Sequence, residues 1–140
     1  YGFIARLGDL HSRNRAGKAV LNVPDGAVAI APAAVPAGEG VLLAALNSEG
    51  RLLAFPVADL PELPRGKGNK IFGISSRKSL VEPDALLAIA AVAPGQTLRV
   101  QSGGRQMGLS FRELADYRGE RGQRGAVLPR GWRKVDGMEV

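Results

Sequence analysis

The sequence contains no cysteine and only one histidine, His11, among its 140 residues. Without thiols the chain can form neither disulfides nor thiolate metal sites, so its fold has to be stabilised by packing alone. A single histidine without cysteine leaves no obvious ligand set for zinc, and we expect His11 to be a surface or loop residue. The absence of cysteine also fits a reducing cytoplasm.

Long apolar runs and an N-terminal leader are lacking as well. The longest apolar stretches fall far short of the roughly 20 residues that cross a bilayer, which excludes a transmembrane helix and predicts no integral membrane association. The chain begins at Tyr1 without methionine or a charged-then-apolar leader, so we expect it to be part of a longer protein. Its length is enough for one domain.

Recognisable catalytic and nucleotide-binding motifs are missing. Residues 66–71 have neither the Gly-Lys-Ser/Thr ending of a P-loop nor the third glycine of a dinucleotide fingerprint. Tyr1 and Tyr117 have no supporting histidine or acidic cluster in the sequence, so neither is predicted to be a nucleophile. Asp9 and Asp59 are predicted to close loops by accepting hydrogen bonds from backbone N–H groups. We therefore expect no catalytic residue, metal site or cofactor in this chain.

Positive charge, by contrast, is abundant and unevenly distributed. The chain has 19 Lys and Arg against 13 Asp and Glu, a net charge of +6. Residues 97–134 hold nine of these basic side chains and three of the acidic ones, so this segment carries the entire net charge. Arginine dominates there, and its planar fork suits phosphate. A polyanion is the natural partner, with a solvated basic face as the alternative.

A repeat of about fifty residues organises the chain. It is marked by acid–leucine pairs that begin at Asp9, Asp59 and Glu113, spaced by 50 and 54 residues. Each pair follows an apolar segment and precedes a loop rich in glycine, arginine and lysine. We interpret the chain as a single domain made of three repeats, roughly residues 1–40, 41–83 and 84–140.

Each repeat is predicted to be β. Val41–Leu46 and Arg51–Val57 flank the hairpin turn Asn47-Ser48-Glu49-Gly50, and Thr97–Val100 and Arg105–Phe111 flank Ser102-Gly103-Gly104 in the same way. Frequent glycine and proline disfavour long helices. Short strands at this period predict an all-β array of about three blades, of the propeller or pinwheel kind.

Three further segments complete the predicted array. Leu86–Val92 fits a buried strand between the turn signals Pro83-Asp84 and Pro94-Gly95, although the Ala/Leu-rich composition from residue 80 would tolerate a helix. The Ala/Pro-rich connector after Val23 is expected to carry one short strand, at residues 27–30. Trp132 is predicted to fill the end of the last blade rather than to stack on a base.

The loops after the acid–leucine pairs are the candidate binding site. Glycine leaves backbone N–H groups open to phosphate, and the cations neutralise phosphate charge and release counterions. If the loops lie along one rim, they form a curved track that DNA can follow by bending, with little sequence specificity. The predicted DNA-binding residues are Arg13, Arg15, Lys18, Arg65, Lys67, Lys70, Arg105, Arg118, Arg121 and Arg124.

Three stretches resemble the C-terminal domain of the A subunit of bacterial topoisomerase IV, within the gyrase A C-terminal repeat family. They are Phe55–Pro61 with Arg65–Ile71, Gly2–Ile4 with Arg13–Ala19, and Gly119–Gly125. The resemblance implies a β-pinwheel, a disc whose blades exchange strands and whose basic rim holds DNA. Three repeats would form only part of that disc, an open arc that would expose blade edges.

The resemblance also implies a parent enzyme, an ATP-dependent type II topoisomerase that decatenates chromosomes and relaxes supercoils. Its catalytic tyrosine, ATP and Mg sites would lie outside this chain, the ATPase in a separate B subunit. The expected partners are duplex DNA, the B subunit, and the remainder of the A subunit. The expected location is the cytoplasm, at the nucleoid, with peripheral inner-membrane association in some family members.

One motif departs from the gyrase pattern. The Gln-Arg-Arg-Gly-Gly-Lys-Gly box of gyrase A does not occur, and the nearest string is Pro64–Lys70. This difference favours topoisomerase IV and argues against strong DNA wrapping. A gyrase-type wrapping domain and a propeller-type module that grips an acidic protein through its basic loops are the alternatives.

Overall fold

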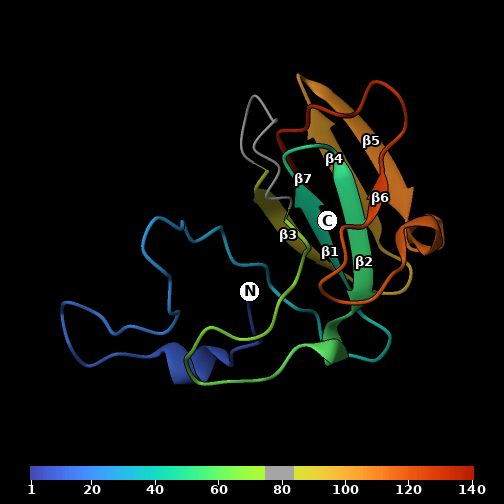
Figure 1. Ribbon diagram of the computed structural model, residues 1–140. Coiled ribbons are helices and arrows are strands. Elements are labelled where there is room, and N and C mark those ends of the chain that lie inside the picture. Colours follow the sequence, from blue (N-terminus) through green and yellow to red (C-terminus); the bar gives the residue numbers. More distant parts are fainter. Residues whose placement is uncertain (75–83) are drawn as a thin grey trace.

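The computed structural model describes residues 1–74 and 84–140 (Figure 1). In these ranges the chain forms seven strands and three 3-10 helices and no α-helix, which confirms the all-β prediction. The strands are β1 (Leu42–Asn47), β2 (Arg51–Pro56), β3 (Leu86–Val92), β4 (Thr97–Ser102), β5 (Arg105–Ser110), β6 (Ala126–Val127) and β7 (Gly137–Glu139). The 3-10 helices are η1 (Leu7–Leu10), η2 (Val57–Asp59) and η3 (Glu113–Tyr117).

Strands β3, β1, β2 and β6 form the first sheet in that order, with antiparallel pairing throughout. The predicted turn between β1 and β2 is confirmed, and Gly50 adopts a φ of 76° that favours glycine. The Asn47 side chain closes the turn, since its Oδ1 accepts hydrogen bonds from the backbone N–H groups of Glu49 and Arg51. Leu86–Val92 is strand β3, as predicted, and the helical alternative for these residues is wrong.

The second sheet has the order β5-β4-β7. Gly103 and Gly104 connect β4 to β5 with φ values of 55° and 83°, as a two-residue turn with two positive φ angles requires. Inward-facing Leu98 and Val100 are buried and Thr97 and Arg99 are exposed, so β4 shows the alternation of a strand with one solvated face.

The first sheet is completed by two strands from the predicted third repeat. β3 and β6 follow residue 84 in the sequence, yet they pair with β1 and β2 respectively. The nearly continuous apolar runs of β1 and β2 fit this arrangement, because both faces of the sheet are covered. Leu42, Ala44 and Leu46 belong to one hydrophobic core cluster, and Leu43 and Ala45 belong to another.

Residues 1–40 form no strand of their own, and the short strand expected at residues 27–30 is not present. This prediction was wrong because a strand needs a neighbour for its backbone N–H and C=O groups, and no strand lies beside this segment in the described residues. The first part of the segment instead extends away from the two sheets, and residues 31–34 line a pocket together with β3 (Figure 1). Residues 75–83, which hold the end of the second predicted repeat and Pro83, lie outside the described residues.

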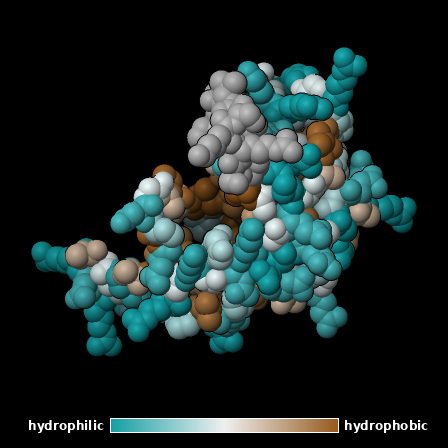
Figure 2. Space-filling model, viewed as in Figure 1, coloured by the Kyte–Doolittle hydropathy of each residue, from teal (hydrophilic) through white to brown (hydrophobic). Residues whose placement is uncertain are grey.

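The surface in Figure 2 is largely hydrophilic, with a hydrophobic hollow between the N-terminal segment and the body of the molecule. Trp132 is partly buried and packs against the cluster that contains Leu114 and Val135, in line with its predicted place at the end of the last blade. No helix in the described ranges is long and apolar enough to cross a membrane.

Phe55→Ala should test the second core cluster. Phe55 is fully buried beside Leu53, Ile71 and Phe72, so the substitution should lower the free energy of unfolding by about 3–5 kcal/mol. Urea denaturation would measure the loss. Val28→Ala, at a residue that is 87% exposed, is the control and should change stability by no more than about 0.5 kcal/mol. Equal losses in the two variants would contradict this description of the core.

Candidate nucleic-acid interface

The end of the first basic loop contacts the middle of the second. Leu21 forms a parallel bridge with Gly66. The Asn22 N–H donates to the Gly66 carbonyl at 2.9 Å, and the Gly66 N–H donates to the Val20 carbonyl at 2.8 Å. The loop that carries Arg13, Arg15 and Lys18 is therefore joined by backbone hydrogen bonds to the loop that carries Arg65, Lys67 and Lys70.

The second loop is joined in turn to the third. The Gly122 N–H donates to the Ile71 carbonyl at 2.9 Å, and the Gly73 N–H donates to the Gln123 carbonyl at 2.8 Å. The Arg121 guanidinium donates to the Lys70 carbonyl at 2.7 Å. The three basic loops, which are about fifty residues apart in sequence, thus form one connected series in space. We call this series the loop track (residues 12–22, 64–73 and 118–125).

Most of the predicted binding residues are exposed. Arg121 and Arg124 are half-buried. The exposed ones are Arg13, Arg15, Lys18, Arg65, Lys67, Lys70, Arg105 and Arg118. In the described part of the chain no carboxylate forms an ion pair with any of these eight, because the ion pairs found there involve other arginines. Seven of the eight lie on the loop track and are available to an anion.

Arg105 is the one exposed residue of these eight that does not lie on the loop track. It lies at the start of β5, where its guanidinium is 4.7 Å from the centroid of the Trp132 ring and donates to the Gly131 carbonyl at 2.9 Å. The structure places it with the chain that follows β6 and not on the loop track. Arg118, at the start of the third loop, forms a parallel bridge with Ala54 of β2.

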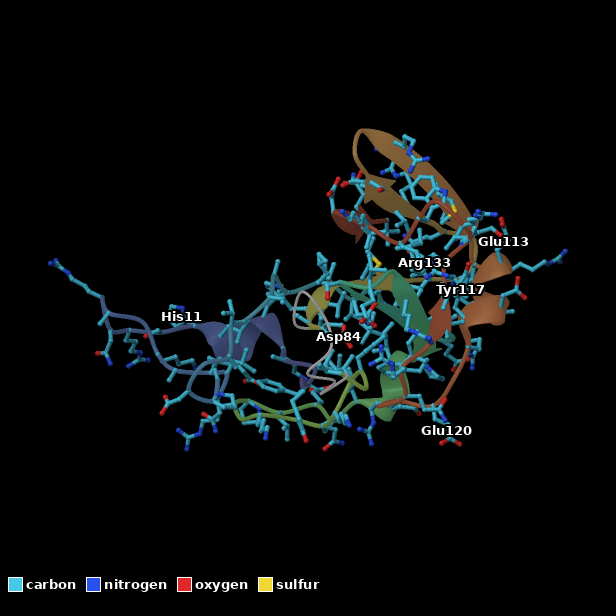
Figure 3. The ribbon with its side chains drawn as sticks, turned by 45° about the horizontal axis from the view of Figure 1, so that its top comes forward. His11, Asp84, Glu113, Tyr117, Glu120 and Arg133 are labelled. Carbon is cyan, nitrogen blue, oxygen red and sulfur yellow. The ribbon has the colours of Figure 1, made fainter. Side chains whose placement is uncertain are left out.

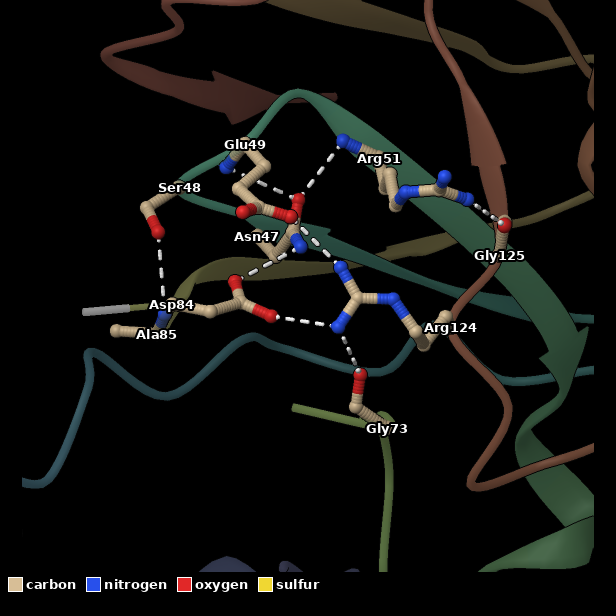
Figure 4. Close-up of polar contacts among 9 residues, drawn as sticks. All are labelled: Asn47, Ser48, Glu49, Arg51, Gly73, Asp84, Ala85, Arg124 and Gly125. Atoms are coloured by element: carbon tan, nitrogen blue, oxygen red, sulfur yellow. Dashed lines mark hydrogen bonds and ion pairs between the residues drawn. The ribbon is translucent and has the colours of Figure 1, made fainter. Parts of the chain in front are cut away.

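Arg124 is the one predicted binding residue whose guanidinium is paired with carboxylates among the described residues (Figure 4). Its Nη2 nitrogen is 2.7 Å from Glu49 and its Nη1 nitrogen is 2.9 Å from Asp84, whose side chain is fully buried. Nη1 also approaches the Gly73 carbonyl at 3.4 Å. Asn47 donates to the other Asp84 oxygen at 2.9 Å.

This network fixes the third loop against the β1–β2 turn. Two further bonds reinforce it, from Arg51 to the Gly125 carbonyl at 3.1 Å and from the Ala85 N–H to the Ser48 hydroxyl at 3.0 Å (Figure 4). Sequence reasoning missed Glu49 and Asp84, because they are separated from Arg124 by 75 and 40 residues. No local spacing could have indicated the pairing.

The residues considered for catalysis show no catalytic arrangement. Tyr117 is buried, and burial, followed by the Asp116 and Glu113 carboxylates, raises the pKa of its phenol, so it stays protonated at neutral pH. His11 is exposed on the N-terminal segment, far from the other residues labelled in Figure 3. Among the described residues no group of three or more histidine and carboxylate side chains could hold a metal ion.

The predicted loop-closing role is wrong for both Asp9 and Asp59. The side chains of Asp9 and Asp59 accept no backbone hydrogen bond in the described residues. Glu113 does, since its carboxylate accepts from the Ser110 N–H at 3.3 Å while its own N–H donates to the Ser110 hydroxyl at 3.2 Å. Asp9 and Asp59 lie exposed in η1 and η2, where the short 3-10 turns close through backbone bonds.

The chain is similar in sequence and in structure to A subunits of DNA topoisomerase 4. The chain is 45% identical over all 140 residues to the DNA topoisomerase 4 A subunit of Pseudomonas aeruginosa and 40% identical to that of Escherichia coli. The solved C-terminal domain of E. coli ParC superposes with a TM-score of 0.81 at 40% identity, covering 99% of this chain and 56% of that one. The chain belongs to the family of topoisomerase IV A subunits.

Membership confirms the resemblance and the pinwheel fold, because the superposed ParC domain is a β-pinwheel. The chain spans about a fifth of the length of these relatives, 19% of the Pseudomonas protein and 18% of the E. coli protein. No family model matches the chain.

Arg124→Met should destabilise the fold because it removes the ion pairs that Arg124 makes with Glu49 and with the buried Asp84 carboxylate. Removing one partner of a buried pair costs about 3–5 kcal/mol. The Arg124 side chain is 34% exposed, so we expect a smaller loss, about 2 kcal/mol. Urea unfolding would measure it against Arg118→Met, an exposed arginine of the same loop that should change little. Indistinguishable midpoints would show that the network does not stabilise the chain.

Proposed function

We propose that the chain binds duplex DNA along the loop track and orients it for a type II topoisomerase. The observation that carries this proposal is the backbone bonding of three glycine-rich loops into one series that presents seven exposed cations without carboxylate partners in the described residues. Such cations neutralise phosphates and release counterions, which supplies sequence-independent affinity. Contacts of this kind position a duplex and carry little base information.

Two of the ten predicted residues have other roles in this proposal. Arg124 holds the third loop in place through Glu49 and Asp84, so it acts on DNA binding by positioning Arg118 and Arg121. Arg105 lies with Trp132, outside the loop track. The remaining DNA-binding residues are Arg13, Arg15, Lys18, Arg65, Lys67, Lys70, Arg118 and Arg121.

The parent protein of this proposal is an ATP-dependent enzyme that decatenates chromosomes and relaxes supercoils. Support comes from its relatives, whose much longer chains are named as A subunits of DNA topoisomerase 4. ATP, Mg and the catalytic tyrosine belong to other regions of the enzyme, and this region uses no cofactor. Its partners are DNA, the B subunit, and the remainder of the A subunit, in the cytoplasm at the nucleoid.

DNA affinity should depend steeply on salt. If the loop track contacts about six phosphates, affinity should fall about a thousandfold between 50 and 200 mM salt. Arg65→Gln, Lys67→Gln and Lys70→Gln together should weaken binding to all duplex sequences alike and should lower the slope of log K against log salt by about three. Fluorescence anisotropy with two unrelated duplexes would measure both effects.

The control removes two cations from other surfaces, Arg99→Gln with Arg112→Gln, and should leave the slope nearly unchanged. A flat salt response, or a loss confined to one duplex sequence, would overturn the loop track as the binding site. An acidic polypeptide that binds in preference to excess duplex DNA would instead support the alternative of a protein-interaction module.

The chain alone should not change DNA topology. Supercoiled plasmid incubated with the chain, ATP and Mg should keep its linking number, because the proposed catalytic groups belong to other parts of the enzyme. Two-dimensional gel electrophoresis after deproteinisation would measure this, with an intact type II topoisomerase as the positive control. Relaxed products that depend on the chain would refute the assignment of a purely DNA-binding role.

A further inference from the structure

The chain between β6 and β7 forms a second basic site together with Arg105 of β5. Arg105 is the one cation of this site that was predicted to bind DNA. An open pocket with a volume of about 600 Å³ lies here. It is lined by Ser102 and Arg105 on the second sheet, and by Leu128, Arg130, Gly131, Arg133 and Lys134 after β6. We call it the hairpin site, because it adjoins the β4–β5 turn. Four of its seven lining residues are cationic.

The four cations have no carboxylate partner in the described ranges. The ion pairs found there use Arg6, Arg99 and Arg124. Arg105 bonds to the Gly131 carbonyl and lies over the Trp132 ring, and its charge, like those of Arg130, Arg133 and Lys134, is not neutralised by an ion pair. All four residues are exposed. Four like charges gathered around one concavity repel one another, and an anion bound among them would relieve that repulsion.

The backbone around the hairpin site is held in place. The Ser102 hydroxyl donates to the Lys134 carbonyl, and the Asp136 carboxylate accepts from the Gly103 N–H at 2.7 Å. The Trp132 ring lies against the Arg105 guanidinium. Gly50 packs so closely on the same segment that a Cβ atom there would lie 2.7 Å from the Arg133 Cα atom. The cations therefore project from an ordered frame.

The hairpin site is separate from the loop track. The third loop ends at Gly125, and β6 lies between it and the residues that line the site. Figure 3 shows Glu120, in the third loop, and Arg133, at the hairpin site, in different parts of the molecule. An anion bound at one place would leave the other accessible.

The lining chemistry favours phosphate over a protein surface. Leu128, the one aliphatic residue in the lining, is 3% exposed, so the side chains that can reach a ligand are mainly those of the four cations. Protein interfaces have an apolar core that is depleted of lysine, whereas DNA interfaces are more polar and much more positively charged. Arginine presents a fork that matches phosphate oxygens, and three of the four cations are arginines.

We propose that the hairpin site binds the phosphate backbone of a DNA segment and gives this region a second DNA contact, away from the loop track. The proposal rests on the proposed DNA-binding function and extends it. A region with two separate contacts can hold two duplex segments, or two distant parts of one bent duplex, at a fixed angle.

The test compares two variants with equal loss of charge in DNA-binding titrations of the whole chain. Arg130→Gln with Arg133→Gln should weaken binding on the order of 10–100-fold at about 0.1 M salt and should lower the salt slope by about two. Arg99→Gln with Arg112→Gln is the matched control and should change neither. Thermal unfolding of each variant should confirm that the fold is retained. A hairpin-site variant that matches the control would overturn the proposal.

A combined variant distinguishes this proposal from the loop track. If the two contacts are independent, the losses from the Arg130/Arg133 pair and from the Arg65/Lys67/Lys70 set should add in free energy. If the loop variant loses its expected DNA affinity and the hairpin-site variant loses none, only the second contact is refuted. Loss in the hairpin-site variant alone would refute the loop track and support the hairpin site. Binding of polyglutamate but not of DNA at the hairpin site would overturn the proposal and reassign the site to an acidic protein partner.

Discussion

The architecture depends on the exchange of strands between repeats. β1 and β2 form a hairpin that is apolar on both faces and would be an aggregation-prone two-stranded ribbon by itself. β3 and β6, supplied by the following repeat, occupy its two edges. Arg118 bridges Ala54 and β6 pairs with β2, so the chain that contains the third basic loop begins and ends beside β2. This placement brings the third basic loop against the second.

The loop track is a consequence of this exchange. Once residues 118–127 are fixed along β2, Gly122 and Gln123 meet Ile71 and Gly73, and the Arg124 guanidinium reaches Glu49 and Asp84. Arg124 is thus used to hold its loop in place, while Arg118 is exposed and Arg121 bonds to the Lys70 carbonyl of the second loop. The same segment, continued past β6, forms the hairpin site, so one exchanged strand separates two basic surfaces.

Several elements could be predicted from residue patterns because they are local. The turn at Asn47–Gly50, the paired glycines at 103 and 104 and the apolar run of β3 follow from turn chemistry and hydrophobicity within a few residues. The short strand expected at residues 27–30 did not form, since its apolar composition was suitable but these residues pair with no strand in the described ranges. The Arg124 network and the grouping of Arg105 with Arg130 and Arg133 escaped prediction, because their members are far apart in sequence.

The sequence by itself determined the all-β class, the excess of arginine after residue 97 and the family, because each follows from composition, turn signals or motifs. Only the tertiary structure decided which cations are free and which are paired, which loops meet, and which strand completes which sheet. Those outcomes depend on contacts between residues 40 to 75 positions apart. Long-range pairing of this kind is set by the packing of whole elements, and local patterns do not encode it.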